Sequence, residues 1–136
     1  MFTPPETSTE ADDGLLTASE IATLELDADW VILSACNTAA ADGTPGAEGL
    51  SGMAKAFFYA GARALLVSHW PVVSAAATEI TTRLFEETAD TAAIGRAEAL
   101  RRSMLSLMNT SDNPYSAHPL FWAPFVVVGE GGKGRI

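Results

Sequence analysis

The sequence contains few residues suited to chemistry, and none of its segments is long and apolar enough to cross a membrane. It has one cysteine and two histidines among 136 residues. A single thiol forms no internal disulfide, and one cysteine with two separated histidines does not give a zinc-ligand spacing. No apolar run approaches the roughly 20 residues that span a bilayer, and the first six residues lack the basic and apolar segments of a signal peptide. We therefore expect a cytoplasmic protein with no metal, no cofactor and no membrane partner.

Basic residues are absent from the first 50 residues, which carry ten of the 17 acidic side chains. The rest of the chain nearly balances its charges, and the net charge of the whole is −9. An acidic surface repels phosphate backbones, so we expect no nucleic-acid partner. Residues 1–14 are rich in Pro, Thr, Ser and acidic residues. We interpret them as a disordered or loop-like acidic arm, and residues 131–136 as a flexible tail.

Hydrophobic residues make up 48% of the chain and charged residues 18%, which indicates one globular domain with a core. Apolar runs predict three buried strands, over 29–35, 64–68 and 121–128. Apolar residues at helical spacing predict helices over 49–60, 75–88 and 92–108. The order is therefore mostly strand alternating with helix, which favours a mostly parallel sheet covered by helices on both faces. Three strands are few for such a sheet, so the chain resembles half of a domain.

Local signals refine these elements. Thr17-Ala18-Ser19-Glu20 matches a capping box and predicts a short helix ahead of the first strand. Gly61 is placed to end the helix over 49–60, and Ser74 to cap the helix over 75–88. In the helix over 92–108, the pattern places Ala97 and Leu100 toward the core and Arg96 toward solvent. Pro124 cannot donate to a ladder, which favours an edge or bulged position for the last strand.

The strand over 29–35 leads directly into Cys36, the only thiol. A cysteine at the carboxyl end of a strand lies where open α/β sheets place their chemistry. The alternative is a small core hydrophobe, which is what a free cysteine in a strand more often is. A catalytic thiol needs a base, because an unassisted cysteine titrates near ~8.5.

The base that Cys36 needs could come from only two histidines, and both follow the cysteine. In caspases the histidine precedes the cysteine by about 50 residues, but here no histidine precedes Cys36. If the first two strands are parallel neighbours, His69 would lie at the same sheet edge as Cys36 and could act as a surrogate base. The alternative is a turn histidine satisfied by backbone or water. His118 is interpreted as a loop residue that hydrogen-bonds locally.

Four glycines at every third position, Gly43, Gly46, Gly49 and Gly52, lie between the first strand and the next helix. Backbone N–H groups at a helix N-terminus attract anions, which raises the possibility of a phosphate site. The spacing is neither G-x-G-x-x-G nor a P-loop, and Asp42 and Glu48 would repel a phosphate. We interpret the segment as a flexible loop with close helix–sheet packing, and a nucleotide-binding module as a distant alternative.

Several motifs in order resemble those of CHAT domains, caspase-like modules of bacterial and some eukaryotic proteins. The matching segments are Trp30-Val31-Ile32-Leu33-Ser34-Ala35-Cys36-Asn37-Thr38, Glu48-Gly49-Leu50-Ser51-Gly52-Met53, Ala60-Gly61-Ala62-Arg63, Val67-Ser68-His69-Trp70-Pro71-Val72 and His118-Pro119-Leu120-Phe121-Trp122-Ala123-Pro124-Phe125-Val126. Together they cover about residues 15–130. The chain is similar to the carboxyl-terminal half of such a domain.

The resemblance implies a partial three-layer caspase-like fold of the clan CD cysteine peptidases, which include caspases, separases and gingipains. It implies that Cys36 is the nucleophile and that its own N–H is one oxyanion donor. The family's His-Gly strand should lie before residue 15, where nothing matches it. His69 matches a position that is Leu or His in the family, so the resemblance does not make it catalytic. The tetratricopeptide-type repeats that often precede CHAT domains are not present in this sequence.

Three hypotheses follow for function. The first is the cysteine-bearing half of an endopeptidase acting on protein or peptide, inactive alone unless a separate polypeptide supplies the His-Gly half. The second is a non-catalytic caspase-like interaction module. The third is a self-contained Cys36/His69 hydrolase. In each case the first strand would have a bare edge, which predicts strand addition or self-association.

Overall fold

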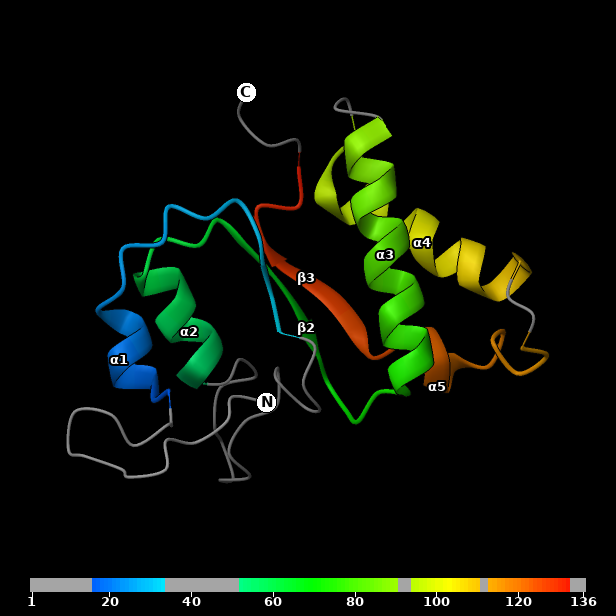
Figure 1. The fold of residues 1–136 in the computed structure, drawn as a ribbon, viewed down its shortest axis with the longest axis horizontal. Helices are drawn as coiled ribbons and strands as arrows, with labels where there is room; N and C mark the ends of the chain where they lie inside the picture. The colour runs from blue at the N-terminus through cyan, green and yellow to red at the C-terminus, as the bar shows by residue number, and fades with distance from the viewer. Residues whose placement is uncertain (1–15, 34–51, 91–93, 111–112, 133–136) are drawn as a thin grey trace, which may run out of the picture.

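The computed structural model describes residues 16–33, 52–90, 94–110 and 113–132. Helices and strands alternate along these residues (Figure 1). In order they are α1 (Ala18–Ala22), β1 (Val31–Ile32), α2 (Gly52–Tyr59), β2 (Ala64–Ser68), α3 (Ser74–Asp90), α4 (Arg96–Thr110), α5 (Pro119–Trp122) and β3 (Phe125–Gly129). The described part of the chain is therefore a mixed α/β structure. No helix within it is long and apolar enough to cross a bilayer.

The three strands form one sheet in the order β1-β2-β3. β1 pairs with β2 in parallel, with Val31 beside Leu65 and Ile32 beside Leu66. β3 pairs with β2 in the antiparallel direction, from Phe125 beside Ser68 to Gly129 beside Ala64. The sheet is therefore mixed, and the expectation of a mostly parallel sheet is wrong. The reason is α5, which returns the chain to the end where β2 finishes, so that β3 runs back along β2.

The strands bury apolar side chains on both faces, because successive residues of a strand point to opposite sides. One face carries the α3–α4 cluster, whose buried members are Leu66, Ala76, Ala77, Ile80, Leu84, Ala99, Leu100, Leu107 and Phe125. The other face carries the α2 cluster, whose buried members are Ala54, Ala62, Leu65 and Val67. In β1, Ile32 packs on the first cluster and Val31 and Leu33 on the second. Helices on both faces, as predicted, make three layers.

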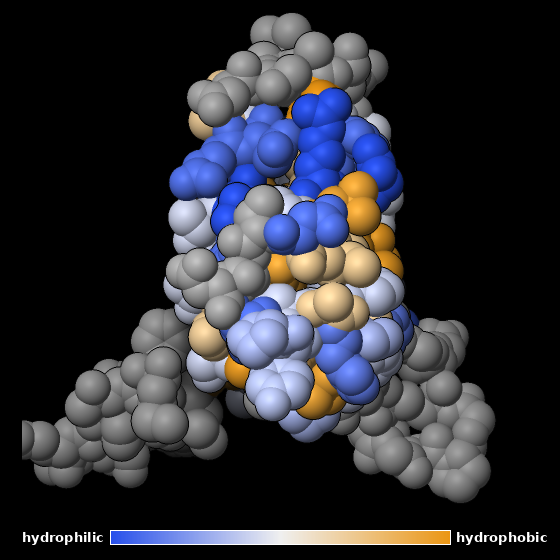
Figure 2. All heavy atoms as spheres, turned by 90° about the vertical axis from the view of Figure 1, so that its right-hand side faces the viewer, coloured by the Kyte–Doolittle hydropathy of each residue, from blue (hydrophilic) through white to orange (hydrophobic). Residues whose placement is uncertain are grey.

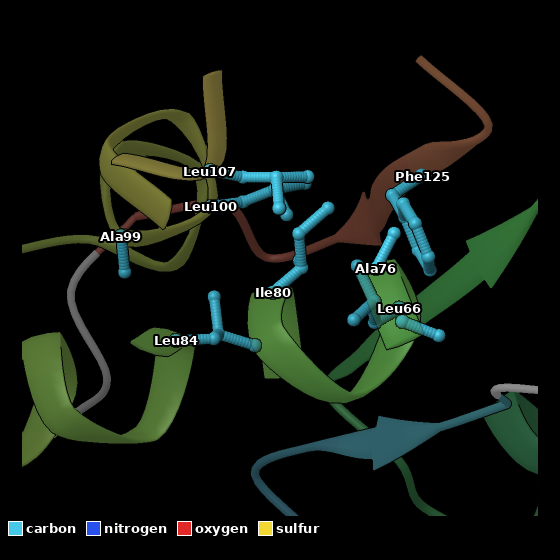
Figure 3. Close-up of a cluster of buried hydrophobic side chains, with 9 residues drawn as sticks. Leu66, Ala76, Ile80, Leu84, Ala99, Leu100, Leu107 and Phe125 are labelled. Atoms are coloured by element: carbon cyan, nitrogen blue, oxygen red, sulfur yellow. The ribbon is translucent and has the colours of Figure 1, made fainter. Parts of the chain in front are cut away.

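The α3–α4 cluster is the larger core. Figure 3 shows Ile80 and Leu84 of α3 directed toward Leu100 and Leu107 of α4, with Leu66 and Phe125 contributed by the sheet. Ile80, Leu84 and Leu107 are all 1% exposed or less. Burying one such side chain contributes roughly 1.5–3 kcal/mol to folding. This cluster therefore holds the two long helices against β2 and β3.

Several predicted ends are confirmed. Thr17 and Glu20 form the capping box in both directions, with Glu20 Oε2 accepting from Thr17 N at 2.7 Å. The strand over 64–68 is β2 with the same bounds. Gly61 follows α2 with φ of 99°, in the left-handed region that a glycine enters without strain. Ser74 differs slightly, because it is the first residue of α3 and Val73 O accepts the first helical bond, from Ala77 N.

Other boundaries differ from the prediction. β1 is assigned only at Val31–Ile32 of the expected 29–35, and the last two residues of that range lie outside the described residues. The expected strand over 121–128 begins as helix α5, and β3 starts only at Phe125. Proline at the first position of α5 favours the helix, since its fixed φ suits N1. Pro124 then directly precedes an edge strand, as predicted.

The buried face of α4 is rotated by about one residue from the prediction. Arg96, expected in solvent, is 4% exposed, whereas Ala97, expected in the core, is exposed. Ser103 lies on the buried face and donates its hydroxyl to Ala99 O at 2.9 Å. A spacing pattern that counts only apolar residues misses a face that includes a buried arginine and a buried serine.

Candidate functional site

The carboxyl end of the parallel pair, where β1 and β2 finish, carries the residues predicted to be chemical. Leu33 N donates to Leu66 O at 2.9 Å, which extends the pairing one residue beyond β1. His69 follows Leu66 by three residues, and Cys36 follows Leu33 by the same number. The strand arrangement on which the Cys36/His69 pairing depended is therefore confirmed. Cys36 itself, with Asn37 and Thr38, lies outside the described residues.

Chain length limits where the thiol can be. Three residues span at most about 11 Å even when fully extended. Cys36 is therefore confined to a sphere around Leu33, at the end of β1. The role of Cys36 stays a prediction, because no contact of its side chain is described.

His69 is exposed and begins the loop between β2 and α3. Its backbone N–H donates to Pro124 O at 3.0 Å, which continues the β2–β3 ladder by one bond. The side chain that follows, Trp70, is 38% exposed. An exposed imidazole at a strand end is available to solvent or to a neighbouring group, so the geometry permits both interpretations of His69.

His118 occupies the same end of the sheet, because α5 directly precedes the start of β3. It is the N-cap of α5, and its Nδ1 accepts a hydrogen bond from Leu120 N at 3.1 Å. An imidazole nitrogen that accepts this bond carries no proton, so any proton of the neutral ring is on Nε2. His118 N donates to Tyr115 O at 2.8 Å. The prediction of local hydrogen bonding is confirmed, and the ring serves as a helix cap.

The amino end of the sheet, where β1 and β2 begin, holds an ion-pair network that the sequence did not reveal. Arg63 reaches Asp27 at 2.6 Å and Asp29 at 2.9 Å. Arg96 reaches the same Asp29 at 3.3 Å, and its Nη1 donates to Glu130 O at 3.1 Å. Asp29 therefore links the loop before β2 to the first turn of α4. Attraction to Asp27, and then to Asp29, raises the pKa of the Arg63 guanidinium.

Arg96 is the buried member of this network. Its guanidinium carbon lies 5.7 Å from the ring centroid of Trp30, a cation–π distance. Its Nε has no hydrogen-bond partner among the described residues. No sequence signal distinguishes Arg96 from the exposed Arg101 and Arg102 of the same helix, since only the fold brings Asp29 and Trp30 to it. The network fixes β1 from the end opposite to Cys36.

The glycine-spaced segment lies outside the described residues except for Gly52. A Cβ built on Gly52 would meet nothing within 4 Å, so close helix–sheet packing does not require glycine there. No group of three or more His, Cys, Asp or Glu side chains that could hold a metal ion is found among the described residues.

Comparison with known proteins gives the family. The model of a family described as CHAT domain matches residues 2–130. Tetratricopeptide repeat protein 28 of Mus musculus is 30% identical over 123 residues, which is 88% of this chain. The chain spans only 5% of the length of that relative. No solved structure matches the chain. With most of its length matched, the chain belongs to the CHAT domain family.

Proposed function

We propose that the chain is the cysteine-bearing part of a cysteine endopeptidase, with Cys36 as the nucleophile. The family is peptidase-like, and this is the coarser statement that its membership supports. The observation that carries the finer proposal is the parallel register of β1 and β2, because it confines Cys36 and His69 to one end of the sheet. The carboxyl ends of parallel strands are where open α/β sheets bind and transform their ligands.

The proposed reaction has two steps. The Cys36 thiolate attacks the carbonyl carbon of a peptide bond, the C–N bond breaks, and the amine leaves with a proton from the protonated base. Water then hydrolyses the thioester and restores the thiol. The backbone N–H of Cys36 stabilises the negative oxygen of the tetrahedral intermediate. A histidine base is needed in both steps.

We propose that this base comes from a histidine outside these 136 residues, so that the chain alone is inactive. His118 is committed to capping α5, since its Nδ1 already accepts from Leu120 N. His69 is the one remaining histidine of the sequence, and a self-contained Cys36/His69 hydrolase is the less favoured alternative. The partner would therefore be a polypeptide segment that brings a histidine to the carboxyl end of β1.

A titration of thiol reactivity tests the proposal, and the single cysteine makes the signal unambiguous. The alkylation rate of Cys36 with iodoacetamide would be measured from about pH 6 to 10 in the native chain, in His69→Ala and in His118→Ala. We expect a midpoint near ~8.5, the value of an unassisted thiol, and the same midpoint in both variants. Cleavage of an unfolded protein substrate should not exceed that of Cys36→Ala.

Two outcomes would contradict this proposal in different ways. A lower midpoint that returns to ~8.5 in His69→Ala, but not in His118→Ala, would support the self-contained hydrolase. A thiol that reacts only after the protein unfolds would mean that Cys36 is a core residue. That result would favour the non-catalytic interaction module, which the commitment of His118 to a helix cap also favours.

A further inference from the structure

The outer edge of β1 presents unpaired backbone groups. Leu33 N–H points to β2, where it donates to Leu66 O at 2.9 Å. Because backbone groups of successive residues point to opposite sides of a strand, the N–H and C=O of Ile32 point away from β2. In the described part of the chain, β1 is the last strand on this side of the sheet. Ile32 therefore offers one donor and one acceptor to a further strand.

This edge is held firmly from the inside. Leu26 N donates to Ala60 O at 2.8 Å, and Arg63 N donates to Ala28 O at 2.9 Å. The backbone that leads into β1 is thus tied to the residues before β2, in addition to the bond from Leu33. The ion pairs of Asp29 hold the same segment. A strand that is already ordered loses little further conformational entropy when another strand pairs with it.

Nothing within Trp30-Val31-Ile32-Leu33 protects the edge. Natural edge strands avoid pairing by means of charged residues, proline or bulges, and this segment has no charge and no proline. The nearest charge, Asp29, is directed to Arg63 and Arg96 and is largely neutralised. An uncharged, β-branched strand with free backbone groups is therefore an interaction surface.

The other edge, β3, is better protected. Pro124 precedes it, and Gly129 ends it with φ of 95°, which turns the chain out of the strand direction. Beyond that turn, Ala97 N donates to Gly131 O at 3.0 Å, so the start of α4 occupies the continuation of β3. The helix side offers no alternative surface. Figure 2 shows hydrophilic side chains gathered on the upper part of that face, with apolar side chains scattered singly among the described residues.

We propose that the outer edge of β1 pairs with β1 of a second copy of this chain, antiparallel about a two-fold axis at Ile32. The two Ile32 residues would then exchange both N–H···O=C bonds, as a hydrogen-bonded pair of an antiparallel ladder does. The contact is isologous and closes on itself, so it produces a dimer rather than a filament. Two sheets join into one continuous sheet of six strands.

Charge selects this arrangement. In an in-register parallel pair the two Asp29 residues would lie side by side, and like charges directly opposite each other destabilise a ladder. In the antiparallel pair centred on Ile32 they lie about 20 Å apart, at six residues of about 3.4 Å each. Val31 instead faces Leu33 of the second copy on the α2 side of the sheet. The two-fold arrangement matches apolar residues with apolar residues. It does not depend on the proposed peptidase function.

Amide hydrogen exchange and sedimentation together test the dimer on the native chain. Sedimentation should show a mass twice that of one chain as concentration rises from about 10 to about 1,000 µM. Over the same range, exchange of the Ile32 amide should slow at least about tenfold, because mass action populates the dimer. The Leu33 amide, bonded to Leu66 within one chain, should not change. The Val127 amide, which points outward from β3, is the matched control for the other edge.

Variants add a second arm. Ile32→Pro removes an N–H that points outward and leaves the Leu33 bond to β2 available, so this variant should be monomeric at every concentration. Ile32→Val keeps the N–H and a β-branched side chain, and should remain dimeric. If Ile32→Pro does not fold, the exchange data on the native chain decide. A monomer at all concentrations, protection of Ile32 that is independent of concentration, or protection that falls on Val127 would each overturn the proposal.

Discussion

The two ends of the sheet are built in opposite ways. At the amino end, three carboxylates and two arginines tie β1, the loop before β2, the end of β3 and the start of α4 together. At the carboxyl end, the backbone bonds Leu33 to Leu66 and His69 to Pro124 continue the ladders. A short helix capped by His118 completes that end. Strong side-chain ties are therefore concentrated away from the residues predicted to act.

This difference indicates a division of labour between the ends. The amino end fixes the direction and register of β1, and so determines where Cys36 begins. The carboxyl end keeps its histidine and tryptophan exposed, which leaves them accessible to a substrate or to a complementing segment. If this comparison is correct, substitutions at the amino end should cost stability, and substitutions at the carboxyl end should cost little.

The largest expected loss follows from Gly129→Ala at the amino end. Gly129 has φ of 95°, and an added Cβ would lie 2.6 Å from Arg63 O and 2.9 Å from Phe58 Cε1. The left-handed backbone and the clash with a backbone oxygen together should reduce the free energy of unfolding by about 2–4 kcal/mol. Urea denaturation followed by circular dichroism measures this change.

Gly61→Ala is the matched control for Gly129→Ala. Gly61 has nearly the same φ, 99°, but its added Cβ would lie 3.4 Å from Asp27 N, which is ordinary contact. Only the backbone strain remains, so the loss should be about 1–2 kcal/mol. Equal losses in the two variants would show that the approach of Arg63 to Gly129 is not as tight as described.

Arg96→Met tests the ion-pair network itself. The substitution keeps an unbranched apolar side chain beside Trp30 but removes the bonds to Asp29 and to Glu130 O. The carboxylates left behind are 60% and 62% exposed, so water can solvate them, and the loss of the unpartnered Nε removes a cost. We expect a loss of about 1–3 kcal/mol in urea denaturation, below that of a fully buried pair.

Arg101→Met is the control for Arg96→Met, on the same helix. Arg101 is 60% exposed and pairs with Glu98 at i,i+3, so its loss should change stability by about 0.5 kcal/mol or less. Stability losses of the same size in the two variants would mean that the position of Arg96 beneath Trp30 has no special role.

The sequence predicted the elements better than their faces. β2, the capping box at Thr17 and the left-handed Gly61 were predictable because each depends on neighbouring residues. The antiparallel direction of β3 was not, because it follows from the path that α5 gives the chain. Arg96 was assigned to solvent because its partners Asp29 and Trp30 are more than 60 residues away.

The candidate site divides in the same way. The parallel pairing of β1 and β2 followed from alternation of strands and helices, and it brings the ends of Leu33 and Leu66 together. The local role of His118 was predictable from its place before Pro119 and a hydrophobic run. A base for Cys36 was not, because a histidine that acts from another segment leaves no trace in this sequence.

His118→Ala should have a smaller effect, at the carboxyl end. The substitution removes the acceptor for Leu120 N, one of the unsatisfied donors of α5. Loss of an N-cap costs about 0.5–1 kcal/mol when the helix is short and exposed. His118→Asn, which keeps an acceptor, should recover most of the loss in urea denaturation. A loss above that of Arg96→Met would reverse the comparison between the two ends.

The smallest expected effect is a change of stability with pH at Glu98, away from both ends. Hydrogen bonds from Arg101, and then from Arg102, lower its pKa from 4.5 to about 2. A carboxyl whose pKa is depressed by folding contributes stability above its unfolded pKa and loses it as pH falls through the folded value. The difference in urea midpoint between the native chain and Glu98→Gln should therefore be constant above about pH 5 and shrink between about pH 4.5 and 2. Because Glu98 lies at the surface, solvent screens its pairs, and the change should be only a small part of the acid-induced loss. A difference that does not vary over this range would mean that the arginines leave Glu98 equally ionised in the folded and unfolded chains.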